Sequence, residues 1–227
     1  DRLFLSNLGR AHLSAAMAGG LTMFMLMTFF MGIIGYVNAL VAQYYGADRR
    51  DQCGLSAAQG IILAGASYPL LLLAMPLGRM LLASSGHDPL QTELEITYFS
   101  ILAYGSVMGL VRAALSSFFC GIGRTRMVMV ANLFGMVVNI CANYILIFGH
   151  FGVPALGMRG AAYGTLIGSA SGLLMMLIPY FSRPIRVEFG TFSGLRLCLP
   201  VLRKLLRFGF PSGVEFFLNM AAFNVFV

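Results

Sequence analysis

Four long stretches without a single charged residue constrain this fold more than any other feature. They cover residues 13–47, 52–78, 127–158 and 160–182. A helix needs about 20 mostly apolar residues to cross the hydrocarbon core of a bilayer, and each stretch is long enough. Over the whole chain 59% of residues are apolar and 10% are charged, whereas a soluble domain has about 25% charged residues. The sequence therefore excludes an ordinary water-soluble domain and a disordered chain.

The same apolar runs predict an all-α polytopic membrane protein. Backbone N–H and C=O groups find no water in the lipid core, so a crossing segment is either a helix or part of a closed barrel. Barrel strands alternate over about ten residues, and these runs are too long and continuous for that pattern. We expect six transmembrane helices, at about 13–44, 54–78, 95–119, 127–149, 160–181 and 206–227.

The connections between these spans alternate in basic content. Connections 46–52, 121–127 and 182–209 together hold ten Lys and Arg residues, and those on the other side hold four. Cytoplasmic loops are enriched in Lys and Arg, so we expect these three basic loops in the cytoplasm of a multi-pass protein of the cell (inner) membrane. The net charge of +7 is then explained by topology, and we expect no nucleic-acid partner.

No pattern of catalytic or metal-binding residues is present. The sequence contains no HExxH, GxSxG or P-loop motif and no paired carboxylates, so it predicts no catalytic residues and no enzyme. The four cysteines form no CxxC or Cys/His pattern, which argues against a disulfide framework, a metal or another cofactor. The histidines lie near span ends, and we interpret them as interface residues: His12, His87 and His150. The acids of the base-poor side are Asp88, Glu93 and Glu95.

Ionisable and amide side chains inside apolar spans are the best pointers to function, because desolvating them is costly. Glu215 faces either lipid, where it is protonated or paired, or a cavity, where it can bind a cation or a proton. Arg112 is either a functional charge within the membrane or a side chain that snorkels to the interface. Asn139 and Asn143 are four residues apart and share one helix face. Glu215 and Asn219 have the same spacing. Such faces indicate either a hydrated cavity or simple hydrogen bonding between helices.

Two further features concern helix packing and chain organisation. Four glycines spaced by four residues in the fifth span predict a smooth ridge for a neighbouring helix: Gly160, Gly164, Gly168 and Gly172. Segment 182–209 is the longest connection and ends in the basic and apolar run LPVLRKLLRFG. It is either a linker between two helix bundles, partly an interfacial helix on anionic lipid, or a plain juxtamembrane loop.

Three segments resemble one transporter family. FFCGIGRTRMVMVANLFGMVVNICANYILIFGHFGVPALGMRGAAYGTLIG (118–168) is similar to the signature of multidrug and toxic compound extrusion (MATE) transporters, in which a G-x-G-x-T-R turn leads into N-x-x-x-(D/N)-Y, LIFG, G-x-P-x-LG and GAA-x-x-T. VNALVAQYYGADRRDQ (37–52) resembles the family's V-A-Q-x-x-G-A turn. LLRFGFPSGVEFFL (205–218) resembles the start of its seventh helix. The resemblance covers essentially the whole chain.

The resemblance implies twelve helices in two six-helix lobes, of which this chain holds helices two to seven. Residues 1–181 then form most of the first lobe, 182–205 the cytoplasmic inter-lobe linker, and 206–227 the truncated first helix of the second lobe. It also implies a secondary antiporter that exports amphiphilic, often cationic compounds in exchange for protons or sodium ions. Besides that small substrate and the coupling ion, which the sequence leaves open as H⁺ or Na⁺, we expect the lipid bilayer as a partner and a monomer at full length.

Site residues carry over from the family motif position by position. Asn139 and Asn143 match an Asn and a carboxylate that help form a cation pocket in the first lobe, so Asn143 replaces a titratable group. Thr165 matches the threonine of GAA-x-x-T. Many members carry a Glu eight residues after the seventh-helix proline, where this chain has Asn219, and Glu215 one turn earlier is its candidate replacement. These five residues are the expected cation and substrate pocket.

Two alternatives to the exporter remain at this stage. A related flippase for lipid-linked precursors predicts a wide cavity lined by several basic residues for phosphate, and Arg112 is the single basic residue in the interior of a predicted span, since Arg207 lies at the start of one. A membrane enzyme, or a non-transporting, degenerate paralogue that serves as a scaffold, agrees with Asn at the expected carboxylate positions. A transport assay in proteoliposomes separates these readings.

Overall fold

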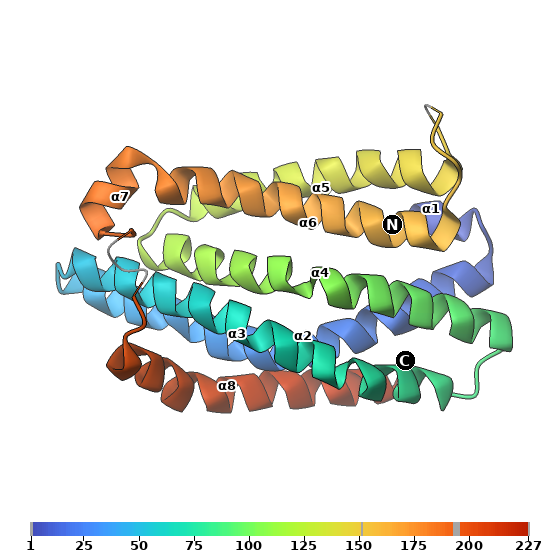
Figure 1. Ribbon diagram of the computed structural model, residues 1–227, viewed down its shortest axis with the longest axis horizontal. Coiled ribbons are helices and arrows are strands. Elements are labelled where there is room, and N and C mark those ends of the chain that lie inside the picture. The colour runs from blue at the N-terminus through green and yellow to red at the C-terminus, as the bar shows by residue number, and fades with distance from the viewer. Residues whose placement is uncertain (1, 151, 193–195, 227) are drawn as a thin grey trace.

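The computed structural model describes residues 2–150, 152–192 and 196–226, and nearly all of them are helical. The long helices lie side by side along one axis (Figure 1). The helices are α1 (Arg2–Ser6), α2 (Arg10–Gly46), α3 (Arg50–Ala83), α4 (Pro89–Gly121), α5 (Thr125–Phe148), α6 (Gly157–Phe181), α7 (Arg183–Phe189) and α8 (Leu199–Phe226). The expectation of an all-α fold is confirmed.

Among the described residues, five helices are long and apolar enough to cross a membrane, and these are α2 to α6. Four of them contain the corresponding expected span and extend it at one or both ends, and α5 covers the expected span 127–149 except for residue 149. The chain is therefore a multi-pass membrane protein. Charged and polar residues at the span ends belong to the helices, because a helix continues through the interface for as long as its sequence allows it.

The last expected span differs from the other five. Its helix, α8, begins at Leu199 rather than at residue 206, because the basic run LPVLRKLLRFG is helical from its first residue. Polar side chains interrupt the apolar half of α8, at Glu215, Asn219 and Asn224, and α8 is not among the five apolar helices of the described chain. At 28 residues and about 1.5 Å per residue it is long enough to span a bilayer. Its crossing of the membrane stays a prediction.

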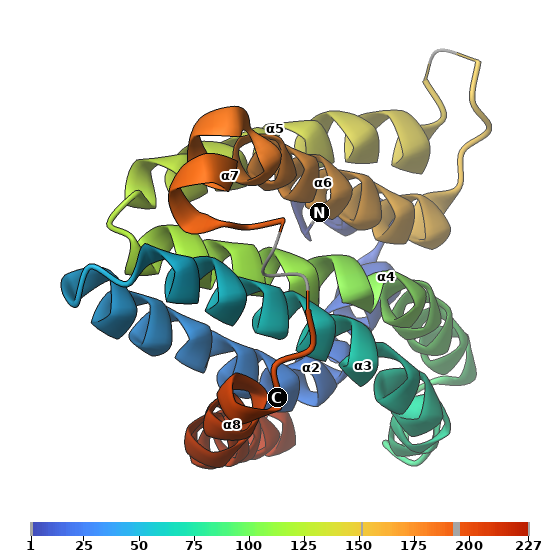
Figure 2. The ribbon, with the colours of Figure 1, turned by 60° about the vertical axis from the view of Figure 1, so that its left-hand side comes forward.

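Helix α4 occupies the middle of the bundle. It packs against α2 and α3 on one side and against α6 on the other. Helix α5 packs on α6, and α8 runs along α2 on the opposite side of the bundle (Figure 2). The α2–α8 contact is close, since a Cβ added to Gly32 would lie 2.6 Å from Cα of Gly213. Small residues permit this approach of two helix backbones.

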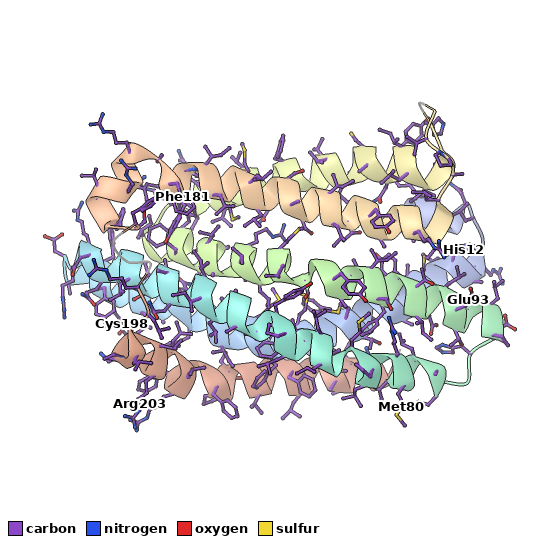
Figure 3. The ribbon with its side chains drawn as sticks, viewed as in Figure 1. His12, Met80, Glu93, Phe181, Cys198 and Arg203 are labelled. Carbon is purple, nitrogen blue, oxygen red and sulfur yellow. The ribbon has the colours of Figure 1, made fainter. Side chains whose placement is uncertain are left out.

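The connections gather at two ends of the bundle, which we name by their charge. The base-rich end carries the α2–α3, α4–α5 and α6–α8 connections, and the base-poor end carries the α3–α4 and α5–α6 connections. Figure 3 labels Cys198 and Arg203 at the base-rich end and His12 and Glu93 at the base-poor end. The connections alternate between the two ends because successive long helices run in opposite directions.

Aromatic side chains form the core of the base-rich end. The ring of Phe118 lies edge-on to those of Tyr180 and Phe189, with centroid separations of 5.4 and 5.5 Å, and all three side chains are fully buried. Edge-to-face pairs at this separation stabilise a core beyond the area that they bury. Because Phe189 belongs to α7, the beginning of the predicted linker is packed into the helix bundle.

Gln59 of α3 holds the backbone of two residues that shortly precede α8, Arg196 and Cys198. Gln59 is buried, and its side-chain amide donates to the carbonyl oxygen of Arg196 at 2.7 Å and accepts from the backbone N–H of Cys198 at 3.1 Å. Gly54 lies directly against the carbonyl oxygen of Phe189, where a Cβ would collide with it. The basic connection of the α6–α8 region therefore rests on α3 at several points.

Candidate functional site

The α5–α6 pair carries the expected glycine ridge. Gly160, Gly164, Gly168 and Gly172 are all buried on α6. A Cβ added to Gly160 would lie 2.5 Å from the carbonyl oxygen of Leu146, and one added to Gly168 would lie 2.5 Å from Cβ of Asn139. The glycines thus let α5 approach the backbone of α6, and this prediction is confirmed.

The two predicted asparagines of α5 face this ridge and bind each other. The Asn143 side-chain amide donates to Oδ1 of Asn139 at 3.2 Å. Asn143 is 0% exposed, and its Oδ1 lies so close to Gly164 that a Cβ there would collide with it. Their four-residue spacing places both on one helix face, so the structure brings together two amides inside an apolar helix pair.

Thr165 lies next to Gly164 on α6 and is half-buried. Its hydroxyl donates to the carbonyl oxygen of Ala161 at 3.0 Å, which is the usual way for a threonine to satisfy its hydroxyl within a helix. The hydroxyl oxygen also has lone pairs for a further donor or for an ion. Asn139 and Asn143 are bonded to each other on α5, and Thr165 follows Gly164, the residue of α6 that Asn143 contacts. We call these three residues the α5–α6 cluster.

The other two predicted pocket residues lie elsewhere. Glu215 and Asn219 are both exposed on α8, which packs against α2 and α3, while α5 packs mainly against α6. The structure thus divides the expected pocket into a cluster of three on α5 and α6 and a polar face of two on α8. Their union in one pocket stays a prediction.

Arg112 lies on the α6 side of α4. Its Nη1 would be 3.4 Å from a Cβ built on Gly172, which places the guanidinium against the glycine ridge. Gly172 lies one turn beyond Gly168 toward the base-rich end. Arg112 is half-buried there, between two helices that are apolar enough to cross a membrane.

Glu95 is a buried and paired carboxylate that the sequence did not single out. Glu95 is 0% exposed in α4, and its Oε1 accepts a hydrogen bond from the Gln91 amide at 2.8 Å and lies 2.8 Å from Nδ1 of His87. Sequence analysis counted Glu95 among the acids of the base-poor side, at the first position of the expected span 95–119, and interpreted His87 as an interface residue. The signal that identifies this group is the four-residue spacing of Gln91 and Glu95, which puts both on one face.

A family model and several known proteins match this chain in sequence. The family model MatE matches residues 1–145. A probable multidrug resistance protein NorM of Neisseria meningitidis serogroup A is 28% identical over 238 residues, which cover 100% of this chain and 50% of that protein. The multidrug resistance protein MdtK of Cronobacter sakazakii is 28% identical over 201 residues, or 86% of this chain and 43% of that protein. The chain spans about half the length of the curated relatives it matches.

Solved structures show the same fold. An inward-facing conformation of a multidrug resistance MATE family transporter of the MOP superfamily has a TM-score of 0.84 at 24% identity, covering 97% of this chain and 50% of that one. An outward-facing conformation of such a transporter has a TM-score of 0.81 at 22% identity, covering 97% of this chain and 48% of that one. The helix arrangement of this chain is therefore the one seen in half of each of those transporters.

Proposed function

Because the chain belongs to the MatE family of multidrug and toxic compound extrusion (MATE) transporters, we propose that it works as part of a secondary antiporter. The protein exports small amphiphilic, often cationic compounds in exchange for protons or sodium ions. It lies in the cell membrane as a monomer, with its base-rich end in the cytoplasm. Support comes from the family match, from relatives named multidrug resistance proteins, and from five apolar helices of membrane-spanning length in the described chain.

The observation that carries the proposal is the buried amide pair. Asn143 is enclosed in an apolar helix pair and bonded to Asn139. An apolar side chain of similar size would fill the same space at a lower desolvation cost. Amide and hydroxyl oxygens are ligands that hard cations accept, and Thr165 supplies a hydroxyl beside the pair. The cluster therefore suits a bound cation that is held by neutral oxygens.

The chemistry of this cluster bears on the coupling ion. Neither amide releases a proton, so the three residues on α5 and α6 favour a sodium ion over a proton at this place. Glu215 on α8 is the titratable candidate among the predicted pocket residues, and proton coupling would pass through it. The ion drives transport when it binds the two conformations unequally.

The division of the predicted pocket supports a two-lobe cycle. Helices α2 to α6 form most of a first lobe, and α8 begins a second one. The cycle rocks one lobe against the other about the α6–α8 connection, as in transporters built from repeats. The α2–α8 contact at Gly32 and Gly213 is then part of the surface along which the lobes move.

The test uses the whole product of the gene that encodes this chain, reconstituted into liposomes. Uptake of a fluorescent organic cation is measured under an imposed sodium gradient and, separately, under an imposed proton gradient. We expect Asn143→Ala to reduce sodium-driven uptake at least about tenfold, a loss of about 1.4 kcal/mol in effective ion binding. Glu215→Gln is expected to reduce proton-driven uptake.

Asn132→Ala is the matched control, because Asn132 is an exposed amide on the same helix, and it should leave both activities unchanged. The proposal fails if no gradient drives uptake by the unmodified protein. The site assignment alone fails if the double variant Asn143→Ala and Glu215→Gln transports as well as the unmodified protein.

A further inference from the structure

Two arginines from different helices line one pocket at the base-poor end, away from the predicted cation and substrate pocket. Arg79 lies near the end of α3 and Arg159 near the start of α6, and both are exposed. They border a pocket of about 420 Å³. Helix α4 packs against both of these helices and lies between them (Figure 1). The pocket thus brings together two guanidinium groups that α4 separates.

Helix α4 fixes the orientation of one of these arginines. Nε and Nη2 of Arg79 donate to Oγ of Ser100 at 3.2 and 3.0 Å. A guanidinium has five N–H donors, so the donors of Nη1 and one donor of Nη2 stay available for a ligand. The Ser100 hydroxyl accepts both bonds and keeps its own hydrogen for donation. Because Arg79 is already positioned, less conformational freedom is lost when a ligand binds.

The charge of this pocket is positive and uncompensated. Its wall, as far as the structure describes the chain, contains two arginines and no acidic residue. Neither arginine takes part in an ion pair among the described residues. Of the acids at this end, Glu95 is engaged by His87 and Gln91, and Glu93 lies one turn nearer to the start of α4, where it lines a neighbouring pocket. An anion in this pocket therefore meets two guanidinium groups that no carboxylate neutralises.

The donor groups of the wall suit a phosphate. Guanidinium groups bind phosphate oxygens through paired N–H bonds. Three hydroxyl groups line the same pocket, those of Thr97, Ser100 and Tyr163, and each can donate to a further oxygen. The volume of the pocket falls within the range of small-molecule sites, about 300–1,000 Å³. A phosphodiester, with two charged oxygens, matches two arginines from opposite walls.

The surroundings of the pocket favour a lipid as the source of that phosphate. Helices α4 and α6 both begin at the base-poor end, so later residues of each lie deeper along the bundle. Tyr104 is one turn deeper on α4 than Ser100 and is 59% exposed, and Ile167 is two turns deeper on α6 than Arg159 and is 43% exposed. Basic side chains at span ends reach the headgroup region, and apolar side chains below them can contact acyl chains. A soluble phosphate would leave this apolar surface unused.

We propose that this pocket binds the headgroup phosphate of an anionic phospholipid from the leaflet at the base-poor end. Arg79 and Arg159 hold the phosphate, and an acyl chain runs along Tyr104 and Ile167. The bound lipid joins α3 to α6 across α4. This site goes beyond the proposed function, because it depends neither on the exported compound nor on the coupling ion.

Quenching of tryptophan fluorescence by a brominated lipid tests the site in a bilayer. The whole product of the gene, carrying Tyr104→Trp, is reconstituted into phosphatidylcholine vesicles with increasing fractions of phosphatidylglycerol that has brominated acyl chains, and the signal of the protein without this substitution is subtracted. We expect phosphatidylglycerol to be preferred over phosphatidylcholine at least about fivefold, the factor that one basic residue near a membrane surface contributes. Arg79→Gln and Arg159→Gln should each reduce the preference, and the double variant should abolish it.

Arg10→Gln is the matched control, because Arg10 is an exposed arginine at the same end and outside the pocket wall, and it should leave the preference unchanged. If Tyr104→Trp does not fold, Ile167→Trp reports on the same acyl chain from α6. Replacing chloride by inorganic phosphate at constant ionic strength should have no effect. The proposal is wrong if neither reporter shows a preference, if the double arginine variant retains it, or if inorganic phosphate removes it, since the site would then belong to a soluble phosphate.

Discussion

Glu188 at the base-rich end and Glu95 at the base-poor end are paired with other side chains in different ways. At the base-rich end Glu188 is 27% exposed, and its two oxygens are paired separately, with Arg50 at 2.6 Å and with Arg124 at 3.2 Å. At the base-poor end Glu95 is fully buried, with two partners on one oxygen and none on the other. The first carboxylate is paired with an arginine through each of its oxygens, and the second meets one histidine and one amide through a single oxygen.

The packing around these two glutamates also differs between the two ends of the bundle. At the base-rich end, α7 is buried against Phe118 and Tyr180, and Gln59 ties the following backbone to α3. At the base-poor end a pocket of about 620 Å³ separates parts of α2, α3 and α8. Packing and backbone hydrogen bonds therefore hold the base-rich end together, whereas the base-poor end combines a pocket with a carboxylate that is paired through one oxygen.

The largest effect should come from disrupting the packing of the base-rich end. Gly54→Val places a branched side chain against the carbonyl oxygen of Phe189, which is backbone and does not yield as a flexible side chain does. We expect the free energy of unfolding to fall by about 3 kcal/mol, measured in detergent by thermal or denaturant unfolding. Gly46→Ala at the same end is the control, because nothing lies within 4 Å of a Cβ there. Equal stability of both variants would show that α7 is not fixed on α3.

Removing the side chain that holds the connection should have the next largest effect. Gln59→Leu leaves the Arg196 carbonyl and the Cys198 amide without their partner, and we expect a loss of about 2 kcal/mol. The connection should also open more often, so trypsin should cleave after Arg196 faster than in the unmodified protein. Gln43→Leu changes an exposed glutamine and should not alter the cleavage rate. A rate unchanged in Gln59→Leu would mean that the connection is held by other contacts.

At the base-poor end, the two members of the charged pair should respond unequally. His87→Ala leaves Glu95 buried beside Gln91 alone, and we expect a loss of about 2 kcal/mol, less than for a fully buried pair because His87 is partly exposed. Glu95→Gln removes the charge together with its desolvation cost, and we expect a change below about 1 kcal/mol. The two unfolding free energies are compared at one pH. This account of the pair is wrong if Glu95→Gln proves the more damaging change.

Sequence patterning predicted the helices well and the charged contacts poorly, for a physical reason. Four of the apolar runs are long and uncharged, so the bilayer alone determines that they are helical, and the glycines at every fourth residue of α6 required a close neighbour. The pairing of Asn139 with Asn143 followed from helical spacing. All of these features are local in the sequence.

The missed features depend on contacts between distant segments. Glu188 meets Arg50 and Arg124 across 138 and 64 residues, and no local pattern indicates that. Glu95 was counted among the acids of the base-poor side, at the first position of an expected span, and no local pattern indicates that Gly19 of α2 lies against its backbone carbonyl. The start of α8 at Leu199 was missed because a basic run reads equally well as a loop or as a helix end. Tertiary structure decides such cases.

The smallest effect on stability should come from Glu188, the paired carboxylate of the base-rich end. Salt should distinguish the effect of changing Glu188 from that of changing His87. Glu188→Gln removes two ion pairs at the surface, which contribute little in water. We expect a smaller fall in the unfolding midpoint than for His87→Ala, and the fall should vanish at about 1 M salt, where the Debye length is about 3 Å. The effect of His87→Ala should persist at that salt concentration, because Glu95 is shielded from ions in solution. A salt-independent effect of Glu188→Gln, or a salt-sensitive effect of His87→Ala, would remove the distinction between the two ends.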